Sequence, residues 1–351
     1  MTSSDVLAAS DCEQVLVLRD RVAAVTAVVA VHDTRLGPAH GGIRRLPYAS
    51  LAAALADVVA LAEAMTWKCA LAEVPAGGGK AVILDRPGLD RAAAYRLVGR
   101  AVAQLGGRYF TGPDVGTTDD DLRVVAQETR FVAGGDGEGP TPGELTAATA
   151  TGVAAALGAL AARLELPMQG LHVAVQGLGA IGMQLCAQLH AAGARLTVAD
   201  VVPARTAAAA SSFGAAVVPA EQIVQTPCDV FAPCALGGVL TATVAAALPA
   251  RGVCGAANNI FAEAEAATVL HRRSVRVVPD FVANAGALIV GATWRLQGVR
   301  VGAERLARIA DTAGELLDRA EAELVPPSVL ALQLAKERLA RGPVAGQVGP
   351  A

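Results

Sequence analysis

Apolar positions in the first part of the chain change between the spacing of strands and that of helices. Residues 15–32 hold β-branched apolar runs and are predicted to form strands. Ser50 stands before a stretch whose apolar residues recur at helical spacing, so we expect a helix with this serine as its N-cap. Gly77–Gly79 are expected to end the segment after that helix, and residues 80–85 to resume as a strand. Residues 90–106 predict a second amphipathic helix, stopped by a glycine pair.

The second half of the chain changes to short apolar runs separated by segments of helix length. A helix is expected at about residues 147–163. The apolar runs after it lie at residues 172–177, 196–200, 215–218, 229–234, 251–257 and 275–282. This alternation is typical of a parallel sheet covered by helices. Residues 302–342 are expected to be helical in two pieces, broken at Pro326–Pro327.

The chain has one stretch that is rich in glycine, proline and acidic residues, at positions 134–144. Such a composition is typical of a hinge or of a boundary between domains. A chain of 351 residues is also long enough for about two domains. We therefore predict the α/β class, with two domains divided near residue 140.

Composition and charge narrow the classes of function. Hydrophobic residues make up 53 % of the chain and charged residues 17 %, which is enough apolar side chain for two cores. The net charge of −3 gives no basic footprint for nucleic acid. No apolar run reaches the roughly 18 residues of a membrane span, and Asp5, Asp11 and Glu13 stand where a signal peptide needs positive charge. We expect a cytoplasmic protein without a nucleic-acid or membrane partner.

Two residue types bear on the chemistry, cysteine and lysine. The six cysteines are scattered without a Cys-x-x-Cys pair, so we expect neither a disulfide framework nor a metal site. Of the 29 basic residues 26 are arginine, and the three lysines are Lys68, Lys80 and Lys336. Arginine cannot supply an amine that loses its proton near neutral pH, so a lysine kept against this bias indicates chemistry. Lys336 lies in a helical segment and is interpreted as a solvated charge.

A glycine pattern typical of dinucleotide binding follows the first strand of the second half. Gly177, Gly179 and Gly182 would allow a tight turn, a close approach to the pyrophosphate and close packing of helix on strand. The phosphates would lie at the N-terminus of the next helix. Asp200 ends the following strand, where a carboxylate binds ribose hydroxyls and repels a 2′-phosphate. NAD is therefore favoured over NADP, although Arg205 keeps NADP open.

Further polar residues stand where catalysis could use them. Lys80 follows three glycines, which let a ligand approach the backbone beside the amine. Lys68 ends a helix in an apolar sequence, where desolvation and a second cation depress the pKa of a lysine and make it a general base. Taken alone, Lys68 is equally explained by the helix dipole, Asp114 by a turn or cap, and His40 by simple exposure.

Eight short sequence blocks carry a further signal. They are LGPAHGGIR (36–44), MTWKCA (65–70), GGGKAVI (77–83), GPDVGTT (112–118), VQGLGAIG (175–182), PCALGG (233–238), GAANN (255–259) and PDFVANAG (279–286). In this order and spacing the chain resembles the leucine, phenylalanine and valine dehydrogenases, relatives of glutamate dehydrogenase, over nearly its whole length. The resemblance implies an enzyme that uses NAD to deaminate an apolar or aromatic L-amino acid oxidatively and reversibly, giving a 2-oxo acid and ammonia.

The resemblance also implies an architecture. Residues 1–142 would form an α/β domain for substrate binding and oligomerisation, and residues 143–325 a Rossmann-type, doubly wound NAD domain. Residues 326–351 would form a C-terminal helix, with a return to the first domain left open. The family's two domains close over a cleft. A homo-oligomer, either a dimer or an octamer, would be built through the first domain.

Roles come to this chain only at positions that match the family's blocks. Lys68, helped by Asn284, would hold the substrate α-carboxylate. Lys80 would be the neutral amine that activates water for attack on the imino carbon, and Asp114 would shuttle protons on the amino group. The other predicted substrate contacts are Gly41, His40, Met65, Leu288 and Gly291. The predicted cofactor contacts are Gly177, Gly179, Ala180, Gly182, Asp200, Thr149, Ala235 and Asn259.

Departures from the family pattern leave the substrate open. His40 stands where the family has an apolar pocket residue, and Gly291 where a bulkier residue is common. After Asn284 the family usually has a Gly-Gly pair, but this chain continues Ala285-Gly286-Ala287-Leu288. A large or partly polar side chain fits these changes. One alternative is the same chemistry on a polar or acidic amino acid. Another is a non-catalytic NAD-binding relative, which the presence of both Lys80 and Asp114 disfavours. A 2-hydroxy-acid dehydrogenase would need an Arg and His pair, which does not follow the dinucleotide loop.

Overall fold

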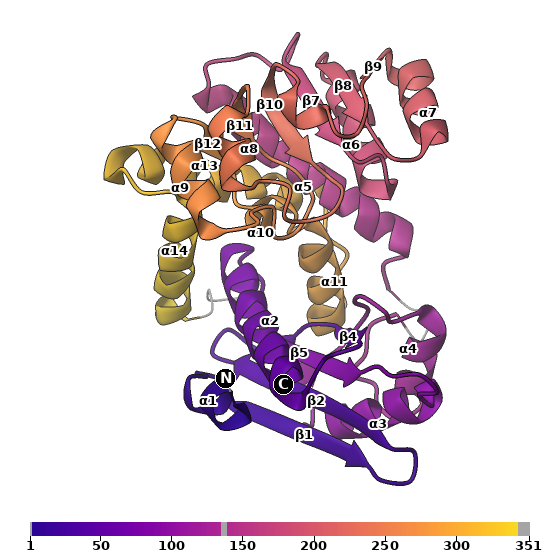
Figure 1. Ribbon diagram of the computed structural model, residues 1–351. Coiled ribbons are helices and arrows are strands. Elements are labelled where there is room, and N and C mark those ends of the chain that lie inside the picture. The colour runs from indigo at the N-terminus through magenta and orange to yellow at the C-terminus, as the bar shows by residue number, and fades with distance from the viewer. Residues whose placement is uncertain (1, 135–138, 343–351) are drawn as a thin grey trace. The chain divides into compact units, whose positions relative to one another are not determined.

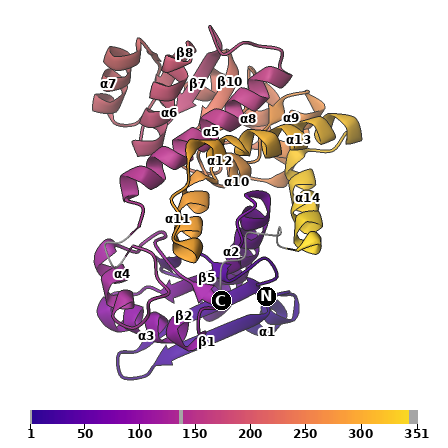
Figure 2. The same ribbon diagram turned by 180° about the vertical axis from the view of Figure 1, so that it is seen from behind.

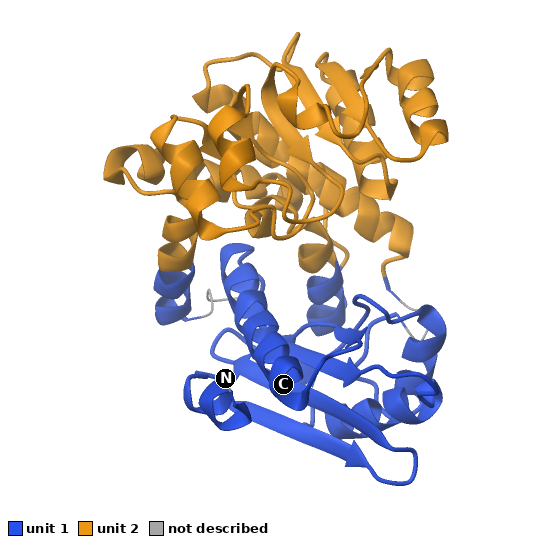
Figure 3. Cartoon of the chain, in the orientation of Figure 1, with its two compact units in different colours: residues 1–139, 291–299, 335–351 blue, residues 140–290, 300–334 orange. Residues whose placement is uncertain are grey.

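The computed structural model describes residues 2–134 and 139–342 (Figure 1). The chain divides into two compact units (Figure 3). The first consists of residues 1–139, 291–299 and 335–351, and the second of residues 140–290 and 300–334. The division between Gly139 and Pro140 lies inside the glycine-rich stretch 134–144, although residues 135–138 of that stretch are outside the described residues. The predicted domain limits stay predictions.

The first unit is built on a six-stranded sheet. The strand order is β1-β2-β5-β3-β6, and β4 also pairs with β5. β2 is antiparallel to β1 and to β5, whereas β3, β4 and β6 run parallel to their partners. The strands are β1 (Gln14–Asp20), β2 (Val25–Asp33), β3 (Ala39–His40), β4 (Ile43–Leu46), β5 (Gly77–Leu84) and β6 (Tyr109–Phe110).

Helices cover both faces of this sheet because its side chains alternate between two cores. Val82 of β5 packs in the core under α1 and α2, whereas Ala81 and Ile83 pack in the core under α3 and α4. Lys80 lies opposite Ala30, which belongs to the first of these cores, so it is on the α2 side of the sheet. The helices are α1 (Ser3–Ala8), α2 (Leu51–Leu71), α3 (Arg91–Gln104) and α4 (Asp119–Ala126).

The start of α2 confirms one prediction and the start of β5 corrects another. The Ser50 side chain accepts a hydrogen bond from the Ala53 N–H at 3.1 Å and is the N-cap of α2. Gly77–Gly79, by contrast, do not end a segment but begin β5. A Cβ on Gly78 would lie 2.3 Å from the Ala62 carbonyl oxygen of α2. The glycines are therefore strand residues that let the helix pack directly on the backbone.

The second unit contains a parallel six-stranded sheet with the order β12-β11-β10-β7-β8-β9. Counted along the chain within this unit, the order is 3-2-1-4-5-6, which is that of the dinucleotide-binding fold. The strand order reverses between the parallel neighbours β7 and β10, and ligands bind at such a point. The predicted α/β class is confirmed. The strands are β7 (His172–Gln176), β8 (Arg195–Ala199), β9 (Ala216–Val217), β10 (Cys228–Pro233), β11 (Ala250–Val253) and β12 (Arg276–Val277).

Helix α5 is the long apolar helix of the second unit. Within the described residues, it alone is long and apolar enough to cross a membrane by length and composition, but half of its most apolar window is buried. It packs against α6 and α13, as Figure 2 shows, so it has the character of a core helix. From α5 to the start of the C-terminal tail, the α-helices are α5 (Pro142–Arg163), α6 (Ala180–Ala191), α7 (Pro203–Phe213), α8 (Ala242–Ala247), α9 (Ala264–Arg272), α10 (Asp280–Ala283) and α11 (Gly286–Gln297).

The C-terminal tail departs from its prediction. It forms three helices rather than two: α12 (Ala303–Ala307), α13 (Ile309–Glu323) and α14 (Pro327–Arg341). The break expected at the proline pair is present, because Leu324 turns the chain with a left-handed φ of 55° and Pro327 begins α14. The additional break lies at Arg308, which ends one helix and begins the next.

Candidate active site

Two residues predicted to carry the chemistry, Lys80 and Asp114, lie in contact in the first unit. Lys80 Nζ is 2.6 Å from Asp114 Oδ2, and both side chains are largely buried. Lys80 extends from the middle of β5, and Asp114 from the loop after β6. That loop is fixed to β4, since the Ile43 N–H donates to the Gly112 carbonyl at 2.9 Å and Thr117 Oγ1 donates to the Ile43 carbonyl at 2.6 Å.

The charge of Asp114 is stabilised from several sides. Burial alone would raise the pKa of its carboxyl group. The opposing effects of Lys80, Arg44 and the Val115 N–H are together larger, so the pKa of Asp114 lies below its ordinary value. The carboxylate is therefore ionised at neutral pH and accepts hydrogen bonds from two cations and from the backbone. Such a group can receive a proton that a neighbouring donor releases.

A chain of polar contacts continues behind Asp114. Arg44 of β4 lies with Nε 3.3 Å from Asp114 Oδ2 and with one terminal nitrogen 3.4 Å from Asp57 Oδ2. Asp57 of α2 also accepts a hydrogen bond of 2.5 Å from the Tyr48 hydroxyl. Burial, with Asp57 close by, raises the pKa of Tyr48, which stays protonated as the donor. The network connects the reactive carboxylate to α2.

Gly41 and Gly42 bring the backbone between β3 and β4 close to the pair. A Cβ on Gly41 would lie 1.9 Å from the Gly79 carbonyl oxygen and 3.4 Å from Met65 Cγ. A Cβ on Gly42 would lie 2.2 Å from the Pro113 carbonyl oxygen. No side chain fits at either position. The fold therefore places predicted substrate contacts Gly41 and Met65 next to each other beside β5.

Lys68 lies in the last turn of α2, three residues after Met65. Residues three apart on a helix share a face, so the two side chains lie on one side of α2. The end of this helix is joined to the start of β5, because Cys69 Sγ donates to the Gly77 carbonyl at 3.4 Å. Lys68 is thus carried by α2 and Lys80 by β5, and these two elements contribute to the same core of the first unit.

His40 has an environment that the other predicted substrate contacts lack. It lies in β3, and its Nδ1 atom is buried with no hydrogen-bond partner among the described residues. Burial, then the positive charges of Arg295 and Lys80, lower the pKa of His40 to about 4. The imidazole is therefore neutral at physiological pH. Arg295 itself donates a hydrogen bond to the Arg130 carbonyl at 2.8 Å.

The glycine loop of the second unit has the geometry needed for a dinucleotide. Gly177 has a φ of 92°, and a Cβ there would lie 2.7 Å from Ala235 Cβ, at the end of β10. A Cβ on Gly182 would lie 2.0 Å from the Gly177 carbonyl oxygen, whereas Gly179 has open space around it. Gly179 is the N-cap of α6 and makes no side-chain cap, so the first N–H groups of the helix, from Ala180 onward, can bind an anion.

Asp200 shapes this loop as well as ending β8. Its carboxylate accepts hydrogen bonds from the N–H groups of Leu178 at 2.7 Å and Val202 at 2.8 Å, and Arg205 lies 3.5 Å away. Burial opposes ionisation, but these donors outweigh it and the pKa of Asp200 lies below its ordinary value. A carboxylate can accept about four hydrogen bonds, so acceptor capacity remains for ribose hydroxyls. The loop, the free helix end and this carboxylate fit a pyridine nucleotide.

Sequence comparisons agree with both halves of this geometry. Residues 12–131 match the dimerisation domain of the Glu/Leu/Phe/Val dehydrogenases, and residues 198–301 match the Glutamate/Leucine/Phenylalanine/Valine dehydrogenase model. Leucine dehydrogenase from Geobacillus stearothermophilus is 38 % identical over 94 % of this chain and 91 % of its own length. The chain belongs to the Glu/Leu/Phe/Val dehydrogenase family. It is an amino-acid dehydrogenase, an oxidoreductase that acts on the CH–NH2 group.

Other members of the family are similarly close. L-Tryptophan dehydrogenase from Nostoc punctiforme is 38 % identical over 93 % of both chains. Phenylalanine dehydrogenase from Lysinibacillus sphaericus is 39 % identical over 79 % of this chain and 75 % of its own length. The crystal structure of the Nostoc tryptophan dehydrogenase superposes on this protein with a TM-score of 0.86 and 35 % sequence identity. The match covers 96 % of this chain and 98 % of the Nostoc chain. The family resemblance predicted from the sequence is confirmed.

The remaining predicted contacts of this dehydrogenase cluster around α5 and the ends of β10 and β11. Thr149 Oγ1 donates to the Leu145 carbonyl at 3.0 Å within α5. Asn259 has a φ of 52°, and its carbonyl accepts from the Gly238 N–H at 2.8 Å. The Asn284 amide donates to Asn258 Oδ1 at 2.7 Å.

The segment after Asn284 departs from the family pattern, and its packing shows which glycine is needed. A Cβ on Gly286 would lie 2.0 Å from the Ala148 carbonyl oxygen of α5, so the close approach requires glycine there. Asn284 and Leu288 belong to the second unit, while Lys68 and Gly291 belong to the first. Their joint role in holding substrate remains a prediction.

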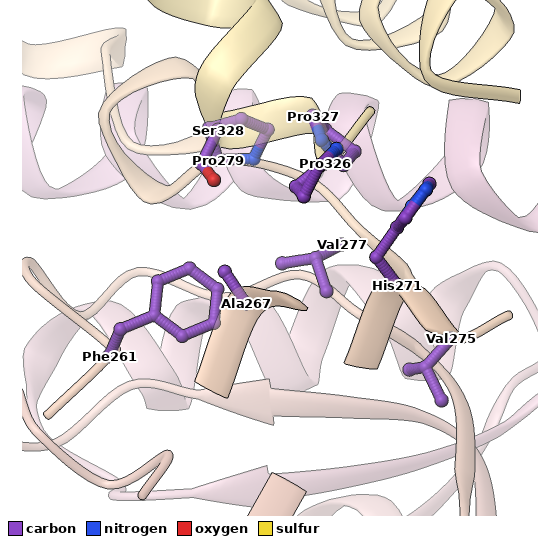
Figure 4. Close-up of a pocket in the computed structure, with 9 residues that line it drawn as sticks. All are labelled: Phe261, Ala267, His271, Val275, Val277, Pro279, Pro326, Pro327 and Ser328. Carbon is purple, nitrogen blue, oxygen red and sulfur yellow. The ribbon is translucent and has the colours of Figure 1, made fainter. Parts of the chain in front are cut away.

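The sequence missed several side chains that the fold brings to the reactive pair. Arg44, Asp57 and Tyr48 received no role, although Arg44 stands in the block that contains Gly41. No local pattern joins Asp57, on α2, to Asp114, far along the chain. The pocket in Figure 4, lined by Phe261, Val277 and Pro327 among others, contains none of the predicted site residues. Among residues 2–134 and 139–342 no group of three or more metal-ligating side chains is present.

Proposed function

We propose that this amino-acid dehydrogenase uses NAD to deaminate an apolar or aromatic L-amino acid to its 2-oxo acid and ammonia. The observation that carries the proposal is the buried contact of 2.6 Å between Lys80 and Asp114. The names of the relatives support the substrate class, since they include leucine, phenylalanine and tryptophan dehydrogenases. The reaction is reversible, and water supplies the oxygen of the 2-oxo acid.

Lys68, Lys80 and Asp114 of the first unit each have a role in the proposed reaction. Lys68, together with Asn284, binds the substrate α-carboxylate through charge and hydrogen bonding. Asp114 accepts a proton from the amino group as the C–N double bond forms. Lys80 acts in the hydrolytic step as the neutral amine, and its Nζ takes a proton from the water that attacks the imino carbon. NAD, when bound, accepts the hydride that leaves the α-carbon. The short distance between Lys80 and Asp114 lets a proton pass directly from one to the other.

The nucleotide is assigned to the second unit, and NAD is preferred to NADP. Gly177, Gly179 and Gly182 bring the backbone close enough for the pyrophosphate, which the N-terminus of α6 stabilises. The Asp200 carboxylate would bind the ribose diol and repel a 2′-phosphate. Arg205, half exposed, lies beside Asp200 and partly offsets that repulsion. A ratio of kcat/KM for NAD over NADP that exceeds one is the expected result.

Assembly and location complete the proposal. The match of residues 12–131 to a dimerisation domain supports a homo-oligomer built through the first unit, a dimer or an octamer. We place the enzyme in the cytoplasm, where a pyridine nucleotide and amino acids are available. Light scattering of the purified chain measures the oligomer directly, and a monomer at micromolar concentration would contradict this part.

The test is a panel of L-amino acids, assayed for NADH formation at alkaline pH. Turnover of leucine, valine, phenylalanine or tryptophan is expected. Glutamate and aspartate serve as acidic comparisons, and the D-enantiomers as controls for stereochemistry. If nucleotide binds but no amino acid is oxidised, the proposed function is wrong, and the non-catalytic alternative would replace it.

A further inference from the structure

His40 has hydrogen-bonding capacity that the folded chain does not use. Its Nδ1 atom is buried and has no partner among the described residues. Buried polar atoms are normally paired, because an unpaired one loses its bond to water without replacement. An unpaired buried atom therefore needs an explanation, such as a functional role or a bound molecule that completes it. The exception here lies in the sheet that also carries Lys80.

The strand register places His40 beside the reactive pair. His40 pairs with Gly78 of β5, and Lys80 is two residues further along β5. Side chains two apart on a strand point to the same face, so Lys80 has the same orientation as the missing side chain of Gly78. His40, in register with Gly78, therefore shares the face of Lys80. Gly78 has no side chain between them, and Ala62 and Thr66 of α2 pack against its backbone instead.

The other strand neighbour of His40 is aromatic. Phe110 of β6 pairs with His40 in register, so the two rings lie on the same face. Phe110 is held by Phe131, with ring centroids 5.2 Å apart and an interplanar angle of 78°. A fixed aromatic ring beside an imidazole forms a surface on which another aromatic ring can pack.

The protonation state of His40 determines which kind of group can complete it. Burial, with Arg295 and Lys80, lowers the pKa of His40 to about 4, so the ring stays neutral. A neutral imidazole with its proton on Nε2 accepts a hydrogen bond at Nδ1. Arg295 is engaged with the Arg130 carbonyl at 2.8 Å. An acceptor nitrogen is completed by a hydrogen-bond donor, which an ionised carboxylate is not.

We propose that His40 determines side-chain specificity, and that it accepts a hydrogen bond from an aromatic substrate that carries an N–H or O–H group, such as tryptophan or tyrosine. This inference rests on the proposed function and narrows its substrate class. His40 would therefore contribute a hydrogen bond to substrate binding, in addition to its packing in the pocket. The hydrogen bond would orient the ring and thereby the α-carbon next to Lys80 and Asp114.

The test compares substrates that differ only in the donor. One pair is tryptophan and 3-(3-benzothienyl)-L-alanine, in which sulfur replaces the indole N–H. The other pair is tyrosine and phenylalanine. In the unaltered enzyme we expect kcat/KM to be about tenfold or more higher for the donor-bearing member of at least one pair, which is the usual result when a site loses a buried hydrogen bond.

Variants of His40 then assign the discrimination to this residue. His40→Leu should bring the ratio within each pair close to one, while His40→Gln, which keeps an acceptor, should retain part of it. His190→Leu removes an exposed imidazole from α6 in the second unit and serves as the matched control. Thermal melts of all three variants show that each is folded, and His40→Gln preserves the test if His40→Leu does not fold.

The possible results separate this inference from the proposed function. Ratios near one in the unaltered enzyme, with phenylalanine or leucine still oxidised, would overturn the role of His40 and leave the function standing. A preserved ratio in folded His40→Leu would overturn it equally, as would a preference for glutamate or aspartate. Absence of turnover on every amino acid would instead refute the proposed function itself.

Discussion

The two ligand-binding regions of this dehydrogenase are built by opposite means. Around Lys80 and Asp114, buried charged side chains from β4, β5, α2 and a loop hold one another in place. Around Gly177 and Gly179, backbone does most of the positioning, and Asp200 is the main charged side chain. The first region must set protonation states, which only side chains can do. The second must approach a pyrophosphate, which side chains would obstruct.

The comparison predicts the largest effect at Asp114. Asp114→Asn keeps the size of the side chain but removes the charge and the ability to take up a proton. We expect kcat to fall by about 10²–10⁴-fold, as for other general acid–base residues, with nucleotide affinity nearly unchanged. Stopped-flow measurement of NADH formation gives the first quantity and fluorescence titration the second. Asp119→Asn, an exposed aspartate of α4, is the control. A loss below about threefold would remove Asp114 from the mechanism.

A substitution in the dinucleotide loop should lower nucleotide affinity. Gly179→Asp places a carboxylate at the free N-terminus of α6, where it would cap the helix and repel the pyrophosphate. Open space around Gly179 lets the chain fold with this change. We expect nucleotide affinity to drop by roughly 10–100-fold with stability maintained or slightly increased. Gly179→Ala adds bulk without charge and should lose less. Equal losses in both variants would show that sterics, not charge, govern the site.

Much of the second region could be predicted because its pattern is local. The three glycines and Asp200 fall within one strand–helix–strand unit, so their spacing alone indicates the turn. The Ser50 cap of α2 was local in the same sense. The chain from Asp114 through Arg44 and Asp57 was not, since its members come from separate segments and meet only in the fold.

Two further elements differ from their predictions. Gly77–Gly79 were assigned to the end of a segment because glycines usually break structure, whereas helix packing makes them part of β5. Residues 275–282 were predicted as one apolar run, but β12 ends at Val277 and α10 begins at Asp280. For the glycines, the deciding contact comes from Ala62 and Thr66 of α2, which the local glycine pattern does not indicate.

Replacement of Arg44 tests the polar network behind Asp114, and its expected effect is of intermediate size. Arg44→Gln removes one of the two cations at Asp114, so the pKa of Asp114 should rise toward its ordinary value. A depressed carboxyl pKa adds stability that is present above the unfolded pKa and is lost as the pH falls through the folded pKa. Because Asp114 accepts a proton only as a carboxylate, the acid limb of the profile of kcat/KM against pH should move to higher pH. Activity at neutral pH should be reduced about tenfold. Arg100→Gln, exposed on α3, should not move it.

The smallest expected effect concerns the helix that carries Met65 and Lys68. Ser50→Ala removes the N-cap of α2 and should lower the free energy of unfolding by about 1 kcal/mol. Chemical denaturation measures this change. Activity of the folded fraction should be affected little, because Ser50 is at the opposite end of α2 from Lys68. A large loss of activity without loss of stability would mean that the cap acts on the site directly.

The proposed mechanism requires Lys80 to act as a lysine, and two lysine variants compared with each other give the sharpest test of this role. Lys80→Ala and Lys336→Ala each remove one of only three lysines, the first buried beside Asp114 and the second exposed on α14. The measurement is kcat/KM for the best amino acid of the panel. We expect kcat/KM to fall by about 10²–10⁴-fold in Lys80→Ala and to change less than about twofold in Lys336→Ala. Comparable activity in both folded variants would contradict it.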